Sequence, residues 1–338
     1  MIESKVKVKR RVALLISSVI LLICIILNLM TGEYRMTFQQ VWQTLLGFGD
    51  SASQLILVEF RLPRLMITLF AGIALSLSGA ILQGVTRNAL AEPGILGINA
   101  GSGFAIALFI AIGQIKADDF VYMLPLVSLI GGLVVTLFLF YFSYEGKKGL
   151  SPESMVLVGI GLSAALSGGA LTLVSSFDKS QSEFISAWLA GNIWGDTWPF
   201  VWAFLPWLVI IIPVILYKAE TLNILNTDDT IAVALGVSLN RQRVILVLAA
   251  ILLSSVAVSV AGAIGFIGLM GPHIARSIIG PRHQSFLPLA MIIGGILLVV
   301  SDNIGQVLLQ PNGLPAGVIA AIIGAPYFLY LMYRVRQF

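Results

Sequence analysis

Long apolar runs separated by short polar connections dominate the chain. Most runs are about 18 to 24 residues long, the length with which an α-helix crosses roughly 30 Å of hydrocarbon, whereas barrel strands would be shorter and would alternate apolar and polar positions. The pattern predicts an all-α, polytopic membrane protein with ten crossing helices in a single transmembrane domain, residues 1–338. We expect the crossings at approximately 12–31, 63–84, 93–113, 121–143, 153–175, 197–217, 243–262, 264–279, 286–304 and 315–333.

Composition supports a membrane protein, and the distribution of charge predicts its orientation. Of the 338 residues, 58% are hydrophobic and 11% are charged, and the mean hydropathy is +0.98, far above that of a soluble domain. Ten crossings place both termini on one side of the membrane, and that side receives 15 of the 20 Lys and Arg residues. Because loops rich in Lys and Arg stay in the cytoplasm, we expect a multi-pass protein of the cytoplasmic membrane with both termini cytoplasmic. The five outer cations are Arg35, Arg61, Arg64, Lys116 and Lys179.

The net charge and the N-terminus each suggest another interpretation, which the pattern does not favour. A net charge of +4 would suggest nucleic-acid binding in a soluble protein, but here the cations follow the loops, so no nucleic-acid partner is expected. The basic stretch from Lys5 to Arg11, followed by the apolar run from Val12 to Leu29, resembles a signal peptide. The run is too long and no small-x-small cleavage site follows it, so we expect it to remain as the first membrane helix.

The chain contains none of the motifs that would indicate an enzyme. It lacks the Gly-x-x-x-x-Gly-Lys-Ser/Thr phosphate loop, the His-Glu-x-x-His zinc motif and the Gly-x-Ser-x-Gly nucleophile motif, and it has a single cysteine and two histidines. We therefore expect that the chain is not an enzyme, that it binds no metal or cofactor itself, and that it does not bind ATP in the P-loop manner.

Acidic residues inside the membrane would mark an ion pathway, because an unpaired charge in hydrocarbon is costly. Glu92, Glu153 and Asp302 lie at the ends of predicted helices and not in their middle. Glu92 and Glu153 each stand beside a proline at a helix start, where an anion stabilises the helix dipole. For Asp302 we favour a packing or capping role over ion coupling. The chain therefore lacks the usual residues for coupling transport to protons or sodium.

One predicted cytoplasmic connection, residues 218–243, contains a helix of its own. Thr227 or Asp228 can cap its start, its apolar residues Ile231 and Leu235 share one face with Ala234, and the helix is predicted to stop at Gly236. An apolar face outside the membrane needs a covering surface. Either a cytoplasmic ATPase or the bilayer surface can supply it, and since the chain has no energy source of its own we favour the ATPase.

Several motifs resemble those of the FecCD-type permease subunits of binding-protein-dependent ABC importers for iron-siderophores, haem and vitamin B12. The likeness runs from about Met36 to the C-terminus. The motifs are Arg61-Leu62-Pro63-Arg64; Gln83 with Arg87-Asn88-Ala89-Leu90-Ala91-Glu92-Pro93-Gly94-Ile95-Leu96-Gly97; Trp188-Leu189-Ala190-Gly191; Ala234-Leu235-Gly236-Val237; Ala261-Gly262-Ala263-Ile264-Gly265-Phe266-Ile267-Gly268-Leu269 with Pro272-His273 and Arg276; and Gly324-Ala325-Pro326.

The resemblance implies a type II ABC importer permease fold and a set of partners. These are a second permease subunit, two cytoplasmic ABC ATPase subunits and an extracytoplasmic siderophore-binding protein, with the translocation path between the two permease subunits and lipid around them. By resemblance, Arg61 and Arg64 receive acidic residues of the binding protein, and His273 is a structural hydrogen-bonding residue. The cytoplasmic gate is assigned to Asn88, Leu90, Ser151 and Ser154, and ATPase coupling to Asp228, Ala234, Leu235, Gly236 and Val237.

The chain departs from the family pattern at two outer positions. Gln306 stands where many relatives have an arginine, and Gly313, in the sequence Pro311-Asn312-Gly313, stands where they often have a glutamate. The joint loss of a cation and an acid indicates one specialised half of a heterodimer. The expected cargo is a ferric siderophore of hydroxamate type, with haem or vitamin B12 as alternatives. An ion-coupled secondary carrier working alone is a third, less favoured interpretation.

Overall fold

The computed structural model describes residues 2–32, 34–113, 122–144, 151–175, 177, 179–308 and 313–335, and the regular elements in these ranges are helices. The predicted outer cation Lys116, the cations Lys147 and Lys148, and the motif residues Pro311 and Asn312 lie outside the described residues. In chain order the helices are α1 (Ile2–Met30), α2 (Phe38–Leu45), α3 (Ser51–Gln54), the π-helix η1 (Leu55–Arg61), α4 (Leu62–Thr86), α5 (Ile98–Gly113), α6 (Leu124–Ser143), α7 (Pro152–Val174), α8 (Lys179–Leu189), α9 (Trp198–Tyr217), α10 (Ala219–Leu225), α11 (Asp229–Ala234), α12 (Leu239–Ala261), α13 (Ile267–Ile279), α14 (His283–Val307) and α15 (Ala316–Val335).

Each of the ten predicted crossings coincides with a helix, so the all-α membrane fold is confirmed. Within the described ranges, eight helical segments are long and apolar enough to span a membrane. The two remaining predicted crossings correspond to shorter helices, α5 with 16 residues and α13 with 13. Each begins several residues later than predicted, because a non-helical segment precedes it.

These two non-helical segments are largely buried in protein, where the bilayer cannot supply hydrogen bonds and the protein must. Side chains of neighbouring helices do so. The Asn99 amide donates to the carbonyl of Ile264, before α13, at 3.1 Å, and the Ser163 hydroxyl donates to the carbonyl of Gly94, before α5, at 3.5 Å. Irregular backbone next to α5 and α13 is thus stabilised by polar side chains from within the bundle.

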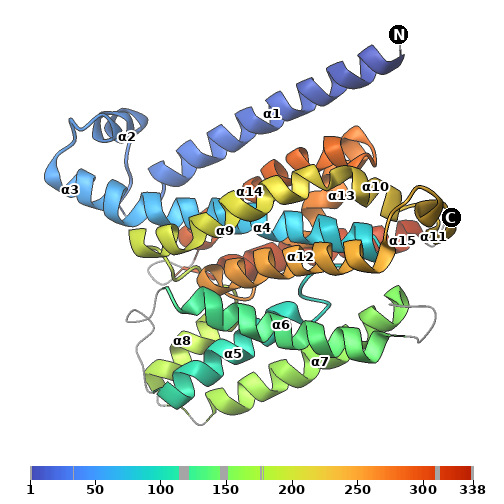
Figure 1. Cartoon of the computed structure of the whole chain (residues 1–338). Coiled ribbons are helices and arrows are strands. Elements are labelled where there is room, and N and C mark those ends of the chain that lie inside the picture. The colour runs from blue at the N-terminus through green and yellow to red at the C-terminus, as the bar shows by residue number, and fades with distance from the viewer. Residues whose placement is uncertain are drawn as a thin grey trace.

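Helix α4 lies at the centre of the bundle, in contact with α9, α12, α13 and α14, while α1 lies at its edge (Figure 1). In the most apolar 18-residue window of the segment that contains α4, 78% of the residues are buried, against 11% in the window of α1. Both termini lie at the end of the bundle that carries α10 and α11, and α2, α3 and α8 lie at the opposite end (Figure 1). We call these the terminal end and the outer end.

Glycines let α4 approach its neighbours closely, as expected for helices that associate without a hydrophobic drive. A Cβ atom on Gly79 would overlap the carbonyl oxygen of Gly268 in α13, and one on Gly72 would overlap the carbonyl oxygen of Gly294 in α14. The small residues in α4 are therefore required by backbone-to-backbone contact on two sides.

Four short elements at the outer end were not predicted from the hydrophobic pattern. Helix α2 begins with a capping box, in which Gln40 N donates to the Thr37 hydroxyl at 3.3 Å and Thr37 N donates to the Gln40 side chain at 2.8 Å. Asp50 caps α3, η1 runs without a break into α4, and α8 follows α7. Pro63 stands at the start of α4, where its missing N–H costs little.

Gly79→Ala tests the close contact between α4 and α13. The added methyl group has no space beside Gly268, so the thermal unfolding midpoint of the purified protein in detergent should fall, since overpacking of this kind costs about 1–3 kcal/mol. Gly161→Ala is the matched control, because a Cβ there meets no atom within 4 Å. Equal midpoints for the two variants would contradict the proposed role of Gly79.

Candidate functional site

Arg61 lies at the outer end, as predicted, but its guanidinium group is engaged within the chain. It donates to the backbone carbonyls of Leu29, in the last turn of α1, and of Tyr34. A cation at the C-terminal end of a helix satisfies free carbonyls and stabilises the helix dipole. Arg61 therefore attaches α1 to the start of α4, in addition to any contact with a partner.

Arg64, the second predicted docking residue, forms an ion pair with Asp302 of α14. Its Nη2 atom lies 2.9 Å from Asp302 Oδ1, and the carboxylate is almost fully buried, with 1% of its side chain exposed against 25% for Arg64. Gln306 donates to the other carboxylate oxygen at 2.6 Å, and Asp196 lies 3.8 Å from Arg64 Nη1. Asp302 therefore packs α14 against α4 through its ion pair with Arg64. Gln306 adds a neutral hydrogen-bond donor to the same carboxylate.

The coupling segment, residues 218–243, forms two short helices and not one. Helix α10 precedes the predicted helix, and the chain turns at Asn226 and Thr227 before α11. Asp228 caps α11 as predicted, and hydrogen bonds from the hydroxyl and the amide of Thr230 hold the pKa of its carboxyl below the usual range. The helix ends before Gly236, which adopts the left-handed conformation with φ 81°.

The predicted apolar face of α11 is open to its surroundings. Ile231 is 52% exposed and Leu235 62%, with Ala234 between them also exposed, and Val233 is 59% exposed. On the other side of α11, Ala232 is buried, and Val237 packs partly against the core of the bundle. An exposed apolar surface of this kind outside the membrane spans is typical of a contact with another protein.

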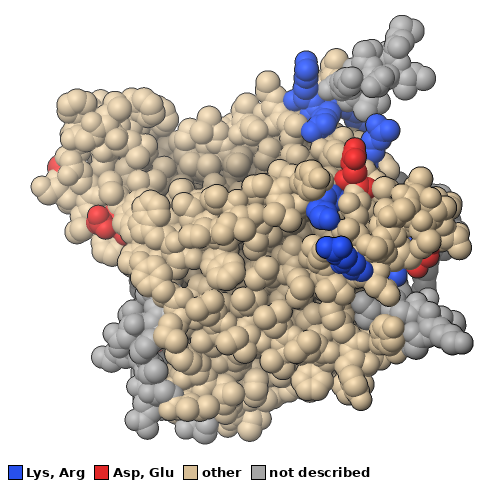
Figure 2. Space-filling model, in the orientation of Figure 1, with Lys and Arg blue, Asp and Glu red and all other residues tan. Residues whose placement is uncertain are grey.

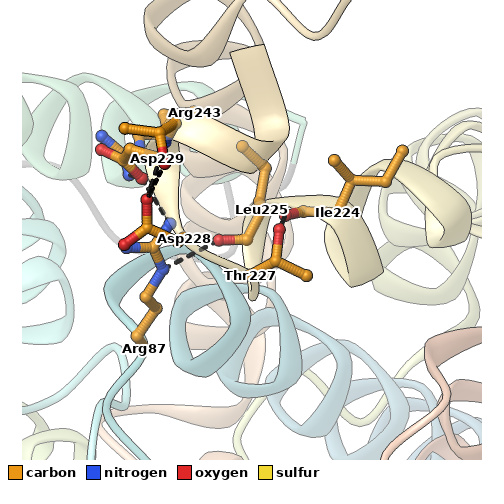
Figure 3. A network of polar contacts seen from close by, with 8 residues as sticks. Arg87, Ile224, Leu225, Thr227, Asp228, Asp229 and Arg243 are labelled. Atoms are coloured by element: carbon orange, nitrogen blue, oxygen red, sulfur yellow. Dashed lines mark hydrogen bonds and ion pairs between the residues drawn. The ribbon is translucent and has the colours of Figure 1, made fainter. Parts of the chain in front are cut away.

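Asp229, which no motif singled out, joins the coupling segment to two other parts of the chain (Figure 3). Its Oδ1 atom accepts from Arg243 at the start of α12, at 2.8 Å, and also from Arg87, which follows α4. Arg87 Nε donates in addition to the carbonyl of Leu225, at the end of α10, at 2.9 Å. One guanidinium group therefore contacts both helices of the coupling segment. The adjacent carboxylates Asp228 and Asp229 in a connection that also holds Arg241 and Arg243 were the only signal of this network in the sequence.

The segment between α4 and α5 contains the predicted gate residues Asn88 and Leu90. It starts at Arg87, which ends α4 in the left-handed conformation with φ 53°, a conformation that costs a non-glycine residue about 1–3 kcal/mol. Asn88 Oδ1 then accepts from Leu90 N at 2.9 Å, a tight local turn. We call residues 87–92 the elbow.

Glu92 ends the elbow and serves a different helix from the one expected. The sequence places it at the start of the crossing 93–113, yet α5 begins only at Ile98. Its buried carboxylate accepts from the backbone N–H of Phe266 at 3.0 Å, directly before α13. The expectation of an anion at a helix N-terminus is correct in kind, but the helix is α13, which lies far away in the sequence.

The other predicted gate residues lie at the start of α7. The Ser151 side chain accepts from Ser154 N at 3.4 Å and caps α7, and Ser151 N donates to the carbonyl of Ser143, at the end of α6, at 3.0 Å. The predicted gate residues therefore lie in two separate places. Asn88 and Leu90 stand between α4 and α5, whereas Ser151 and Ser154 stand where α6 is followed by α7.

His273 has a hydrogen-bonding partner within the bundle. Its Nδ1 atom is hydrogen-bonded to the hydroxyl of Tyr327 in α15. Among the described residues, no group of three or more His, Cys, Asp or Glu side chains is arranged to hold a metal ion.

Basic side chains gather at the terminal end of the molecule, around α10 and the start of α1, while acidic side chains are visible at both ends in the same view (Figure 2). Because Lys and Arg favour the cytoplasmic side, the cytoplasmic position of the terminal end stays a prediction that rests on these cations.

Comparison with known proteins places this geometry in a family. Residues 20–334 match the model of the FecCD transport family. The chain is 38% identical over 334 residues to the iron(3+)-hydroxamate import system permease protein FhuG of Bacillus subtilis (strain 168), covering 97% of this chain and 98% of that protein. It is 35% identical over 298 residues to the Fe(3+) dicitrate transport system permease protein FecD of Escherichia coli (strain K12), covering 87% and 91%.

A solved structure of an ABC transporter assigned to the metal-chelate type, in an inward-facing conformation, has the same fold. It superimposes with a TM-score of 0.81 at 29% sequence identity, covering 96% of this chain and 99% of that chain.

A double-mutant cycle tests the buried pair of Arg64 and Asp302. Asp302→Asn leaves a largely enclosed guanidinium without its counter-charge and should destabilise the protein by about 2–3 kcal/mol, seen as a lower thermal unfolding midpoint in detergent. Combining it with Arg64→Gln should cost less than the two single changes together. The exposed pair of Lys179 and Glu183, 3.9 Å apart, is the control and should show no shift when neutralised. Strictly additive effects at Arg64 and Asp302 would argue against a functional ion pair.

Proposed function

Because this chain belongs to the FecCD transport family, we propose that it is a permease subunit of an ATP-driven ABC importer that moves a ferric siderophore of hydroxamate type across the cytoplasmic membrane. The observation that carries the cargo assignment is the match to an iron(3+)-hydroxamate permease over 97% of the chain. In this proposal, ATP is hydrolysed by two separate cytoplasmic subunits, the terminal end faces the cytoplasm, and an extracytoplasmic binding protein delivers the cargo.

The exposed face of α11 supports the ATPase contact. Its apolar residues lie outside the segments long enough to span a membrane, at the end where basic side chains gather (Figure 2). Burying such a face against a partner protein removes it from water. Helix α11 ends at Ala234, and Leu235, Gly236 and Val237 follow it. We assign these four residues, together with Asp228, to this contact.

The surface of α7 supports a second permease subunit beside this one. In its most apolar 18-residue window only 11% of the residues are buried, and the helix is rich in glycine. A Cβ atom added at Gly161 or Gly168 would meet no atom within 4 Å. A cavity of about 360 Å³ lies next to these glycines and is lined by uncharged residues, among them Ile160 and Ser167. Small residues on an open helix face allow a neighbouring helix to approach closely. We propose an unlike partner, because Gln306 and Gly313 remove charges that a second subunit can retain.

The bonds made by two buried carboxylates argue against an ion-coupled carrier. The carboxylate of Asp302 is occupied by Arg64 and Gln306, and that of Glu92 by the backbone of Phe266. A carboxylate that binds and releases ions during transport needs an exchangeable partner.

Reconstitution tests the transport function. The chain, its partner permease and the ATPases in proteoliposomes, supplied with the loaded binding protein, should take up a ferric hydroxamate in an ATP-dependent manner. Ferric citrate, haem and vitamin B12 serve as competing cargoes. Uptake of one of these in place of the hydroxamate would replace the cargo assignment. Uptake by this chain alone, driven by a proton or sodium gradient and indifferent to ATP, would overturn the importer.

Two substitutions with opposite expected effects test docking at Arg64. If carboxylates of the binding protein compete with Asp302 for this guanidinium, Asp302→Asn should tighten the binding protein's affinity and Arg64→Gln should weaken it, each about threefold to tenfold. General damage to the outer end would weaken binding in both variants. Arg35→Gln, at an exposed arginine of the same end, is the control for loss of a cation. Weaker binding in both test variants, or no change in either, would remove Arg64 from the docking surface.

A further inference from the structure

We propose that the contact between Arg87 and Asp229, the Arg87–Asp229 link, transmits movement of the coupling segment to the elbow that carries Asn88 and Leu90. The inference rests on the proposed function, because it assumes that an ATPase moves this segment. It gives a positioning role to Arg87, which belongs to the same motif as the gate residues, and to Asp229, which belongs to none of the motifs.

Arg87, directly after α4, extends its side chain to the coupling segment (Figure 3). Its guanidinium group donates to Asp229, in the first turn of α11, and to the carbonyl of Leu225, at the end of α10. A planar guanidinium holds two acceptors in a fixed relation, which a single ammonium group cannot do. A shift of the turn between α10 and α11 therefore either moves Arg87 with it or opens the bond between Arg87 and Asp229.

The two contacts of Asp229 differ in burial, and this difference shows which of them can open. The side chain of Arg243 is 7% exposed, so separating it from Asp229 would leave a buried positive charge without its counter-charge, which is costly. The side chain of Arg87 is 32% exposed and that of Asp229 44%, so water can replace this contact at little cost. Asp229 thus stays attached to α12 through Arg243, and its bond to Arg87 is the exchangeable one.

Movement of Arg87 reaches the predicted gate through the backbone. Arg87 is the left-handed residue at which α4 ends, and the turn made by Asn88 and Leu90 follows it directly. The far end of the elbow is fixed, because Glu92 is buried and bonded to Phe266. A segment of six residues held at both ends changes its conformation when one end is displaced.

Measuring uptake and ATP hydrolysis in the reconstituted complex tests the link. Arg87→Gln should lower the cargo moved per ATP hydrolysed about tenfold, the size of a typical coupling between sites, while ATP hydrolysis stays within about twofold of the unmodified complex. Arg87→Lys keeps the charge but lacks the rigid, planar arrangement of donors that holds two acceptors in a fixed relation, so it should lose about threefold. Arg282→Gln, an exposed arginine at the same end, is the control and should change neither quantity.

A reporter on the elbow separates transmission of movement from simple stability. Ala89 is exposed between the two gate residues, and Cys24, the sole native cysteine, can be replaced by serine. In the Cys24→Ser, Ala89→Cys background, the rate of maleimide labelling should differ between the nucleotide-free and the vanadate-trapped complex. Adding Arg87→Gln, or Asp229→Asn, should remove most of that difference.

The outcomes distinguish this inference from the proposed function. If the unmodified complex shows no ATP-dependent uptake, the proposed function fails. If it transports and Arg87→Gln keeps both the normal ratio of cargo to ATP and the normal labelling difference, the Arg87–Asp229 link transmits nothing and the inference is wrong. Should Arg87→Gln fail to assemble, Arg87→Lys decides, and a normal ratio in that variant would overturn the inference equally.

Discussion

The structure depends on one constraint: within hydrocarbon, every backbone N–H and C=O group must find its partner inside the protein. Helices satisfy this requirement by themselves, and α4 adds close backbone contacts to α13 and α14 through Gly79 and Gly72. Where the chain leaves helical geometry, before α5 and before α13, the polar side chains of Ser163, Asn99 and Glu92 supply partners for the backbone. The non-helical segments are consequently held by α7, by α5 and by Glu92, and Glu92 also fixes the far end of the elbow that follows α4.

The two ends of α4 carry ionic contacts of different character. At the outer end the carboxylate of Asp302 is buried and also accepts from Gln306, so the pair with Arg64 fixes α4 against α14. At the terminal end the carboxylate of Asp229 is 44% exposed, and water competes for its contact with Arg87. A buried pair resists rearrangement because opening it strands a charge, whereas an exposed pair exchanges readily. The geometry suits a permease whose outer end, where a binding protein would dock, is rigid, and whose terminal end, where an ATPase would bind, can change conformation.

Local patterns in the sequence predict the helices of the bundle and the cap of α11, because hydrophobic run length, Asp228 and Gly236 act over short distances. They do not predict α2, α8 or α10, whose lengths of 8, 11 and 7 residues fall below any membrane criterion. They also miss pairings across the chain. Arg64 meets Asp302, 238 residues away, and Arg87 meets Asp229, 142 residues away, and only the packing of α4 against α14 and the coupling segment brings these groups together. The same limit explains why Glu92 was assigned to the helix next to it in sequence and not to α13.

The charges of the outer end restrict how a partner can be recognised there. On the predicted orientation that side holds nine of the 16 acidic residues and five of the 20 basic ones, so its overall field repels an acidic protein. Arg64 is neutralised by Asp302, and Gln306 adds a hydrogen bond without adding a charge. An acidic partner would therefore gain little from long-range attraction to this subunit. Recognition through Arg61 and Arg64 would instead require local hydrogen bonds, in which incoming carboxylates replace backbone carbonyls at Arg61 and share with Asp302 the Arg64 guanidinium, whose side chain is 25% exposed. Such an exchange favours a partner whose acidic groups are placed to meet both guanidinium groups at once, which gives specificity more than affinity.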